Sequence, residues 1–168
     1  MARLFDDVGL HEFIGGRPET ADELRDRYAR LVDGSGRPGE IWLNWIVRRK
    51  SDAIAVGTVQ ATIFEETDRP PVAELAWIIA SQWQRQGFAS QAASALVEWL
   101  AVRGVDEIVA HLHPGNLASA VVASRAGLHA TDEHQDGETV WRNVDARVDG
   151  HRARNLHIST DDEKDLEH

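Results

Sequence analysis

The stretch from residue 72 to residue 113 constrains the fold more than any other part of this sequence. The apolar segment 72–80 predicts a strand, and a loop containing Gly87 separates it from a long helix predicted over 87–103. A second strand is predicted over 107–113. Two strands joined through a helix run parallel when they share a sheet, and the crossover is right-handed. The sequence therefore predicts a mixed α/β, or α+β, domain.

The other predicted elements complete the order α, β, β, β, α, β, α, β. Thr20 and Glu23 have the spacing of a capping box at the start of the first helix. The segments 41–49 and 53–64 predict an antiparallel hairpin, Asn116 is expected to cap a short helix that ends at Gly127, and residues 138–144 predict a last strand. The polar residues between these two elements, around His129 and His134, are expected to form a turn.

Length and composition set the broad class of the protein. A chain of 168 residues fits one domain, here placed at residues 1–144, and we expect a mobile tail over 145–168 that ends in a tag remnant at 166–168. Lys and Arg number 18 against 28 Asp and Glu, and a net charge of −10 disfavours a nucleic-acid partner and favours cationic ligands such as amines. The absence of cysteine excludes disulfides and a thiol nucleophile. Neither a membrane segment nor a secretory signal is visible, so we expect a cytoplasmic protein.

The loop between the first parallel strand and its helix has the composition of an anion site. Small residues at Gly87 and Ala89 let the backbone approach a ligand closely. The free N–H groups of the first helical turn, together with the helix dipole, favour a phosphate. The loop lacks the Gly-Lys-Ser/Thr ending of a P-loop. A strand–helix turn that uses glycine only for its backbone conformation is the alternative.

Two segments together resemble the GNAT acetyltransferases. The pattern Gln-x-x-Gly-x-Ala at residues 84–89 resembles their acyl-CoA pyrophosphate loop. The segment Asn-Leu-Ala-Ser-Ala-Val-Val-Ala-Ser-Arg-Ala-Gly at 116–127 resembles the helix of the branch that acetylates ribosomal-protein N-termini. They occur in family order, one helix and one strand apart, and the resemblance spans residues 41–144. It implies a GNAT-like mixed central sheet flanked by helices, with splayed parallel strands around a CoA site.

The resemblance also implies the cofactor contacts. Acetyl-CoA would be the co-substrate, without a metal, and the strand before the loop would pair with pantetheine through its free backbone. Asn116 would bond the pantetheine arm, and Arg125 would reach a CoA phosphate unless it is simply a solvated helix residue. The remaining expected cofactor-binding residues are Trp77, Ile78 and Ile79 on the strand and Gln84, Arg85, Gln86, Gly87, Phe88 and Ala89 in the loop.

The candidate catalytic residues follow from the same comparison and from the strand pattern. Ser119 would lie near the thioester sulfur as the acid for the departing thiolate. Glu74 lies in an apolar strand, where burial would make its carboxylate a stronger base; the alternative is a solvent-facing or Arg-paired glutamate. His113, near the end of the next strand, is the second candidate base. Trp42 and Asn44 share one strand face, which in this family lies near the acceptor pocket.

The expected function is therefore acetyl-CoA-dependent N-acetylation of a primary amine, either a protein N-terminus or a small molecule. The alternative is a non-catalytic acyl-CoA-binding sensor or accessory subunit. GNAT domains begin with a strand, and residues 1–18 offer no convincing first strand. Either the start is truncated or another element fills the edge, such as the tail or a second subunit. An unfilled sheet edge invites pairing, so a homodimer is one hypothesis.

Overall fold

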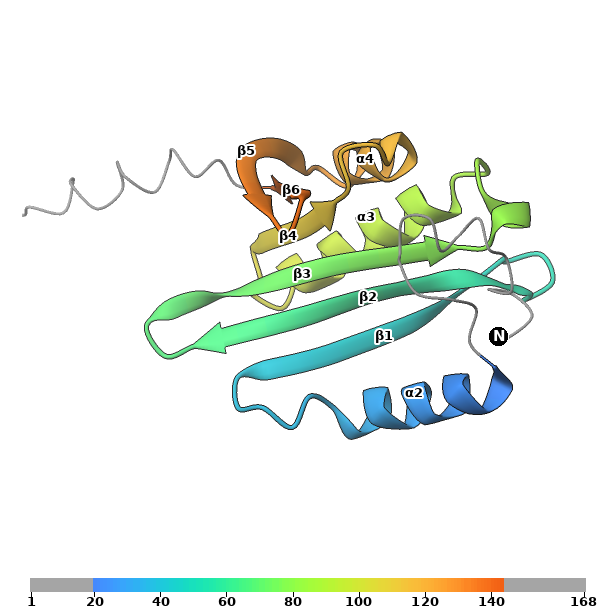
Figure 1. Cartoon of the computed structure of the whole chain (residues 1–168), viewed down its shortest axis with the longest axis horizontal. Helices are drawn as coiled ribbons and strands as arrows, with labels where there is room; N and C mark the ends of the chain where they lie inside the picture. The colour runs from blue at the N-terminus through green and yellow to red at the C-terminus, as the bar shows by residue number, and fades with distance from the viewer. Residues whose placement is uncertain (1–19, 144–168) are drawn as a thin grey trace, which may run out of the picture.

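A six-stranded mixed sheet with the strand order β1-β2-β3-β4-β6-β5 organises the part of the chain that the structure describes, residues 20–143 (Figure 1). The structure is a computed structural model. Predictions about the first strand, the tail and the tag remnant fall on residues outside this range. The elements are α2 (Ala21–Asp33), β1 (Glu40–Arg48), β2 (Ala55–Glu66), β3 (Arg69–Ile79), the 3-10 turn η3 (Ser81–Trp83), α3 (Phe88–Ala101), β4 (Glu107–Leu112), α4 (Leu117–Arg125), β5 (His129–Gln135) and β6 (Glu138–Arg142).

The predicted elements all occur, and two local predictions are confirmed at atomic detail. Thr20 and Glu23 form the capping box of α2 in both directions. Asn116 caps α4, with its side chain accepting from the Ser119 N–H. One prediction is wrong: the residues from His129 to Gln135 form strand β5 and not a turn. Among the described residues β5 is an edge strand that pairs with β6 alone, and nearly all its side chains are exposed, so no alternating pattern marks it in the sequence.

The core lies between the sheet and α3, which runs behind the sheet in the view of Figure 1. Leu96 and Leu100 of α3 pack against the strand residues Ala61, Leu75 and Ile108. A second small cluster joins Ala93 of α3 to Val122 and Ala126 of α4. The helices α3 and α4 are thereby fixed to each other as well as to the sheet.

The two parallel strands pair for only a short distance. β3 and β4 are in register at Val72–Glu107, Ala73–Ile108 and Glu74–Val109. Beyond this point β3 continues to Ile79 beside β2, and β4 continues to Leu112 beside β6, without further pairing between β3 and β4. The predicted splay of the central parallel strands is therefore confirmed.

The close approach of β2 to β3 beside this splay depends on Gly57. Gly57 lies opposite Ile79, and a Cβ at this position would collide with the Ile78 carbonyl.

β1 and β5 are the two edges of the sheet within the described residues, and the expected homodimer stays a prediction. None of the helices within residues 20–143 has the length and apolar character that crossing a bilayer requires.

Candidate active site

The loop from Gln84 to Gly87 joins η3 to α3 in a constrained backbone conformation. Arg85 and Gly87 both adopt positive φ, at 60° and 84°. The loop's own side chains hold this shape: Gln84 Nε2 donates to the Ile79 carbonyl at 3.0 Å, and Gln86 Nε2 donates to the Gln82 carbonyl at 3.3 Å. A non-glycine residue at positive φ costs free energy and marks a loop whose shape matters.

The N-terminus of α3 opens directly from this loop. Its N-cap is Gly87, and no side chain in the described part of the chain caps the helix. The Gly87 carbonyl accepts the Gln91 N–H at 3.0 Å, which leaves the N–H groups of Phe88, Ala89 and Ser90 in the uncapped first turn. Free amides backed by a helix dipole attract an anion. This uncapped turn is compatible with the predicted phosphate site, which stays a prediction.

The gap between β3 and β4 runs from the Glu74–Val109 pair toward the end of β3, which leads into this loop. Ala80 donates its N–H to the Val56 carbonyl at 3.0 Å, so strand alternation turns the backbone of Ile78 toward β2. The same alternation turns the backbone groups of Trp77 and Ile79 toward the gap. The Trp77 side chain packs against both apolar clusters, one of which includes Ala93 of α3, and this ties the β3 wall of the gap to α3.

Asn116 and Ser119 lie where α4 begins, just after β4 ends. The Asn116 Oδ1 accepts the Ser119 N–H at 3.0 Å as the helix cap, so the amide nitrogen Nδ2 is the group left to face a ligand. Ser119 is half-buried in the first turn of α4. These two side chains therefore flank the β4 side of the gap, opposite the loop.

His113 is an exposed residue in the turn after β4, and its ring is engaged by that turn. Its Nδ1 accepts the Gly115 N–H at 3.0 Å. In a neutral ring this contact places the proton on Nε2, so Nε2 is a donor and the acceptor nitrogen is already in use. His111 lies half-buried on β4 opposite Val140. Within residues 20–143 no group of three or more His, Asp or Glu side chains could hold a metal ion, and the expectation that no metal takes part stays a prediction.

Glu74 marks the point where the gap opens. It is the last residue of β3 in register with β4, and its side chain is exposed, so the expectation of a buried carboxylate is wrong. Glu74 pairs with Thr62 on β2, and Thr62 in turn pairs with Trp42 on β1, so the three residues form one row across the sheet. Trp42 Nε1 donates to Glu40 Oε1 at 2.7 Å. The sheet thus aligns a candidate acceptor residue with the candidate base.

Asn44, the other candidate acceptor residue, lies one row further along the same face. It is exposed, and its neighbours across β2 and β3 are Gln60 and Ala76. The polar residues Thr62 and Gln60 between the candidates were not singled out by sequence reasoning, because a hairpin register cannot be read from one strand alone. The face therefore carries more polar groups than the sequence predicts.

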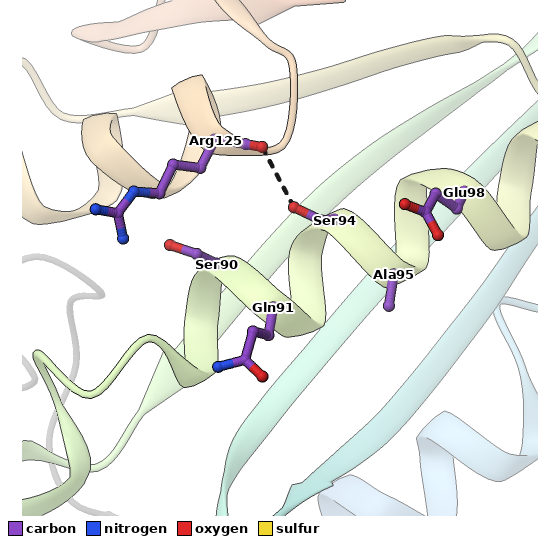
Figure 2. A pocket seen from close by; sticks show the side chains of 6 residues that line it. All are labelled: Ser90, Gln91, Ser94, Ala95, Glu98 and Arg125. Carbon is purple, nitrogen blue, oxygen red and sulfur yellow. Dashed lines mark hydrogen bonds between the residues drawn. The ribbon is translucent and has the colours of Figure 1, made fainter.

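A groove of about 420 Å³ runs between α3 and α4. Figure 2 shows its lining residues, with the Arg125 side chain extending toward the Ser90 end and Glu98 at the other end. Ser94 Oγ donates to the Arg125 carbonyl at 3.3 Å and joins the two helices. Sequence reasoning named Arg125 but missed the serines, which lie about a turn apart on one face of α3. The lining residues are Ser90, Gln91, Ser94, Ala95, Glu98 and Arg125.

The loop is also supported from the hairpin turn between β1 and β2. The Arg49 guanidinium lies over the Trp83 ring at 4.4 Å from its centroid, and Trp83 meets Phe88 edge to face at 6.4 Å. Asp52 forms an ion pair with Arg49, and this hydrogen bond lowers the pKa of the Asp52 carboxyl. Arg49 therefore supports Trp83 before the loop, and through Trp83 it supports Phe88 after the loop.

The fold, the splayed strands and the uncapped helix define a class of acyltransferase. The profile of the family described as "Acetyltransferase (GNAT) domain" matches residues 1–129. The chain belongs to the GNAT acetyltransferase family. A search of curated protein sequences finds no significant match.

Solved structures of acetyltransferases have a similar fold. The aminoglycoside acetyltransferase AAC(6')-Ib in complex with coenzyme A and kanamycin has a TM-score of 0.65 and 19% identity, covering 84% of this chain and 84% of that one. A GNAT-family acetyltransferase from Bacillus anthracis has a TM-score of 0.61 and 18% identity, covering 84% of this chain and 82% of that one. At these identities the likeness concerns the fold.

Proposed function

We propose that this chain transfers the acetyl group of acetyl-CoA to a primary amine by direct attack in a ternary complex. The observation that supports the proposal is the gap that runs from the Glu74–Val109 pair toward the end of β3, where the loop leads into the uncapped N-terminus of α3. Such a gap offers backbone groups to an extended amide chain, while the helix terminus offers N–H groups to a diphosphate. Acetyl-CoA carries both features in one molecule.

In this arrangement the cofactor is held largely by backbone. The N–H groups from Arg85 to Ala89 bind the pyrophosphate, and the backbone of Trp77 and Ile79 pairs with pantetheine in the gap. Ile78 contributes its half-buried side chain, because its backbone turns toward β2. Asn116 donates from Nδ2 to a pantetheine carbonyl, since its oxygen caps α4. Gln84 and Gln86 act indirectly by holding the loop.

The chemistry needs one new bond and two proton movements. The neutral amine attacks the thioester carbonyl, the C–N bond forms and the C–S bond breaks. Ser119 donates its hydroxyl proton to the departing thiolate and takes a proton back from solvent water. Glu74, which is exposed, accepts the amine proton through water. His113 is the alternative base, and it needs its Nδ1 to be released from the Gly115 N–H first. Positioning supplies most of the acceleration, as in other reactions between two bound substrates.

The acceptor is a small-molecule amine or a protein N-terminus that approaches over Trp42 and Asn44. The likeness in fold to an aminoglycoside acetyltransferase solved with kanamycin supports a small-molecule amine. The resemblance of residues 116–127 to the branch that acetylates ribosomal-protein N-termini supports a peptide. Both acceptors present a primary amine to the same carbonyl.

The first test is calorimetric titration of the protein with acetyl-CoA, followed by an amine panel. Release of CoA is read with a thiol reagent, and the chain gives no background because it contains no cysteine. We expect stoichiometric binding and CoA release with at least one amine. Binding without turnover on any amine favours the sensor or accessory-subunit alternative. Absence of binding contradicts the proposal.

A further inference from the structure

We propose that Glu40 is a positioning residue for the acceptor: it holds the Trp42 indole in one orientation, so that the ring binds a second cationic group of the amine. This inference rests on the proposed function, because it concerns the acceptor side of the same site. It narrows the acceptor class to amines that carry a further positive charge at some distance from the reacting nitrogen.

The sheet face that carries Trp42 lies on the side opposite α3, which runs behind the sheet in Figure 1. Ala61 and Leu75 pack in the core with α3, so their strand neighbours Thr62 and Glu74 point to the other side. Trp42 pairs with Thr62 and therefore belongs to the same face. Since Glu74 is exposed and Trp42 is half-buried, a ligand can reach this row from solvent.

Both carboxylate oxygens of Glu40 are engaged beside Trp42. Oε1 accepts the Trp42 Nε1–H at 2.7 Å, and Oε2 lies 3.4 Å from the Arg37 guanidinium. The Glu40 side chain is only 13% exposed, whereas that of Arg37 is 78% exposed. A short, charge-assisted hydrogen bond to a shielded carboxylate restricts the rotation of the indole ring. Glu40 is therefore placed to fix the ring and not to bind a ligand itself.

The charges on this face favour a cation. On the rows from Glu40 to Ile46, the charged side chains are those of Glu40 and Glu74, and both are acidic. An aromatic ring attracts a cation through its quadrupole, and an indole whose N–H donates to a carboxylate is richer in electrons. The members of these rows are Glu40, Phe64 and Val72; Trp42, Thr62 and Glu74; Asn44, Gln60 and Ala76; and Ile46, Thr58 and Ile78.

The separation between Trp42 and Glu74 indicates the length of the acceptor. The two residues lie two strands apart in one row, so their Cα atoms are about 10 Å apart at about 4.8 Å per strand. In the proposed function the reacting nitrogen lies close to Glu74, where the gap to β4 opens. A second ammonium group, joined to it through several methylene groups, then reaches the Trp42 ring. Diamines should therefore be better acceptors than monoamines of the same length.

The first measurement follows the Trp42 indole N–H by NMR in the ¹⁵N-labelled protein and needs no turnover. Trp42→Phe assigns its signal among those of the six tryptophans. In the protein saturated with CoA, 1,5-diaminopentane should shift this signal, and 1-aminohexane, which has the same length without the second charge, should leave it in place. The same small shift with both amines would contradict binding of a second cation at Trp42.

The second measurement compares kcat/KM for each diamine from 1,4-diaminobutane to 1,8-diaminooctane with that of the monoamine of equal length. We expect the wild type to prefer at least one diamine by about fivefold, as a cation–π contact would give. Glu40→Leu should bring this ratio close to one by raising KM for the diamine without lowering kcat. Glu40→Gln should keep most of the ratio, because its amide oxygen still accepts the indole N–H. Glu65→Leu, which removes an exposed carboxylate near the end of β2, is the matched control and should keep the wild-type ratio.

The outcomes separate this inference from the proposed function. If the wild type uses every diamine and its monoamine equally, the second-cation assignment is wrong while acetyl transfer stands. If Glu40→Leu keeps the preference, or if Glu40→Gln loses as much of it as Glu40→Leu, Glu40 does not act by holding the indole. Unchanged turnover of the monoamine in Glu40→Leu would show that the variant is folded. Absence of turnover with every amine would contradict the proposed function instead, and the NMR titration would still decide whether a second cation binds at Trp42.

Discussion

At the scale of single residues, a substitution at Gly87 should change both the free energy of unfolding and the affinity for acetyl-CoA, and the two effects can be measured separately. Its φ of 84° is one that L side chains rarely adopt, and a Cβ would meet only the flexible Gln91 side chain, at 3.3 Å. Gly87→Ala should therefore lower the free energy of unfolding by about 1 kcal/mol, through backbone strain. It should also weaken acetyl-CoA binding, because relief of the strain rotates the loop amides. Denaturant unfolding and calorimetry measure the two effects.

Gly104 provides the matched control at the other end of α3. Its φ is 78°, and a Cβ there would meet nothing within 4 Å. Gly104→Ala should cost about the same free energy of unfolding, again roughly 1 kcal/mol, without changing the affinity for acetyl-CoA. An equal loss of affinity in both variants would mean that general destabilisation, and not the loop conformation, controls binding.

Ser119 tests the proposed chemistry at the same scale. Its backbone N–H is used by the Asn116 cap, and its hydroxyl is the group assigned to the departing thiolate. Ser119→Ala should lower kcat by about 10²-fold, the lower end for a general acid, with little change in the dissociation constant for acetyl-CoA. Ser124→Ala, an exposed position on the same helix, is the control. Wild-type turnover in Ser119→Ala would remove this serine from the mechanism.

At the scale of elements, the β1–β2 turn supports a loop that lies more than thirty residues later in the chain. Arg49 lies over Trp83, and Trp83 packs against Phe88 at the start of α3. Arg49→Gln removes the cation–π contact, worth about 0.5–1 kcal/mol at an exposed site, so acetyl-CoA affinity should fall about two- to fivefold. Hydrogen exchange should accelerate in residues 84–88 and stay unchanged in β2 and β3. An unchanged affinity together with unchanged exchange would contradict this support.

The elements also show where sequence reasoning succeeds. The apolar stripe of α3, the caps at Thr20 and Asn116 and the strands of the β1–β2 hairpin have local signals that the structure confirms. β5 has none, because an exposed edge strand buries neither face. The splay after Glu74 came from the family resemblance and not from periodicity.

The unpredicted parts of the site depend on contacts between distant residues. The groove brings Ser94 to Arg125, 31 positions later, through the packing of two helices. The row from Trp42 to Glu74 depends on the register of three strands. Neither the contact between the two helices nor the register of the three strands produces a recognisable spacing of residues in the sequence. Sequence analysis can therefore name such residues one by one but cannot show that they lie together. The exposure of Glu74 could not be predicted either, because the sequence of an apolar strand with one solvent-exposed face resembles that of a strand buried on both faces.

At the scale of the whole molecule, the net charge of −10 acts differently on the two substrates. Acetyl-CoA is an anion, so the proposed site has to hold it by local donors, such as the amides of α3, against the overall field. A cationic amine is drawn by the same field from any direction. The charge therefore favours acceptors that carry a positive charge beyond the reacting amine, because that charge persists when the attacking nitrogen is neutral.

This difference predicts an ionic-strength dependence that belongs to the acceptor. For an acceptor that has a second, permanent positive charge, kcat/KM should fall when the Debye length shortens from about 30 Å at low salt to about 8 Å at physiological ionic strength. For an amine of similar size without that charge, kcat/KM should change much less. Saturating acetyl-CoA in both series removes the effect of salt on cofactor binding. Equal salt dependence of the two acceptors would mean that the overall charge plays no part in acceptor choice, and that contacts along the Trp42 face decide it alone.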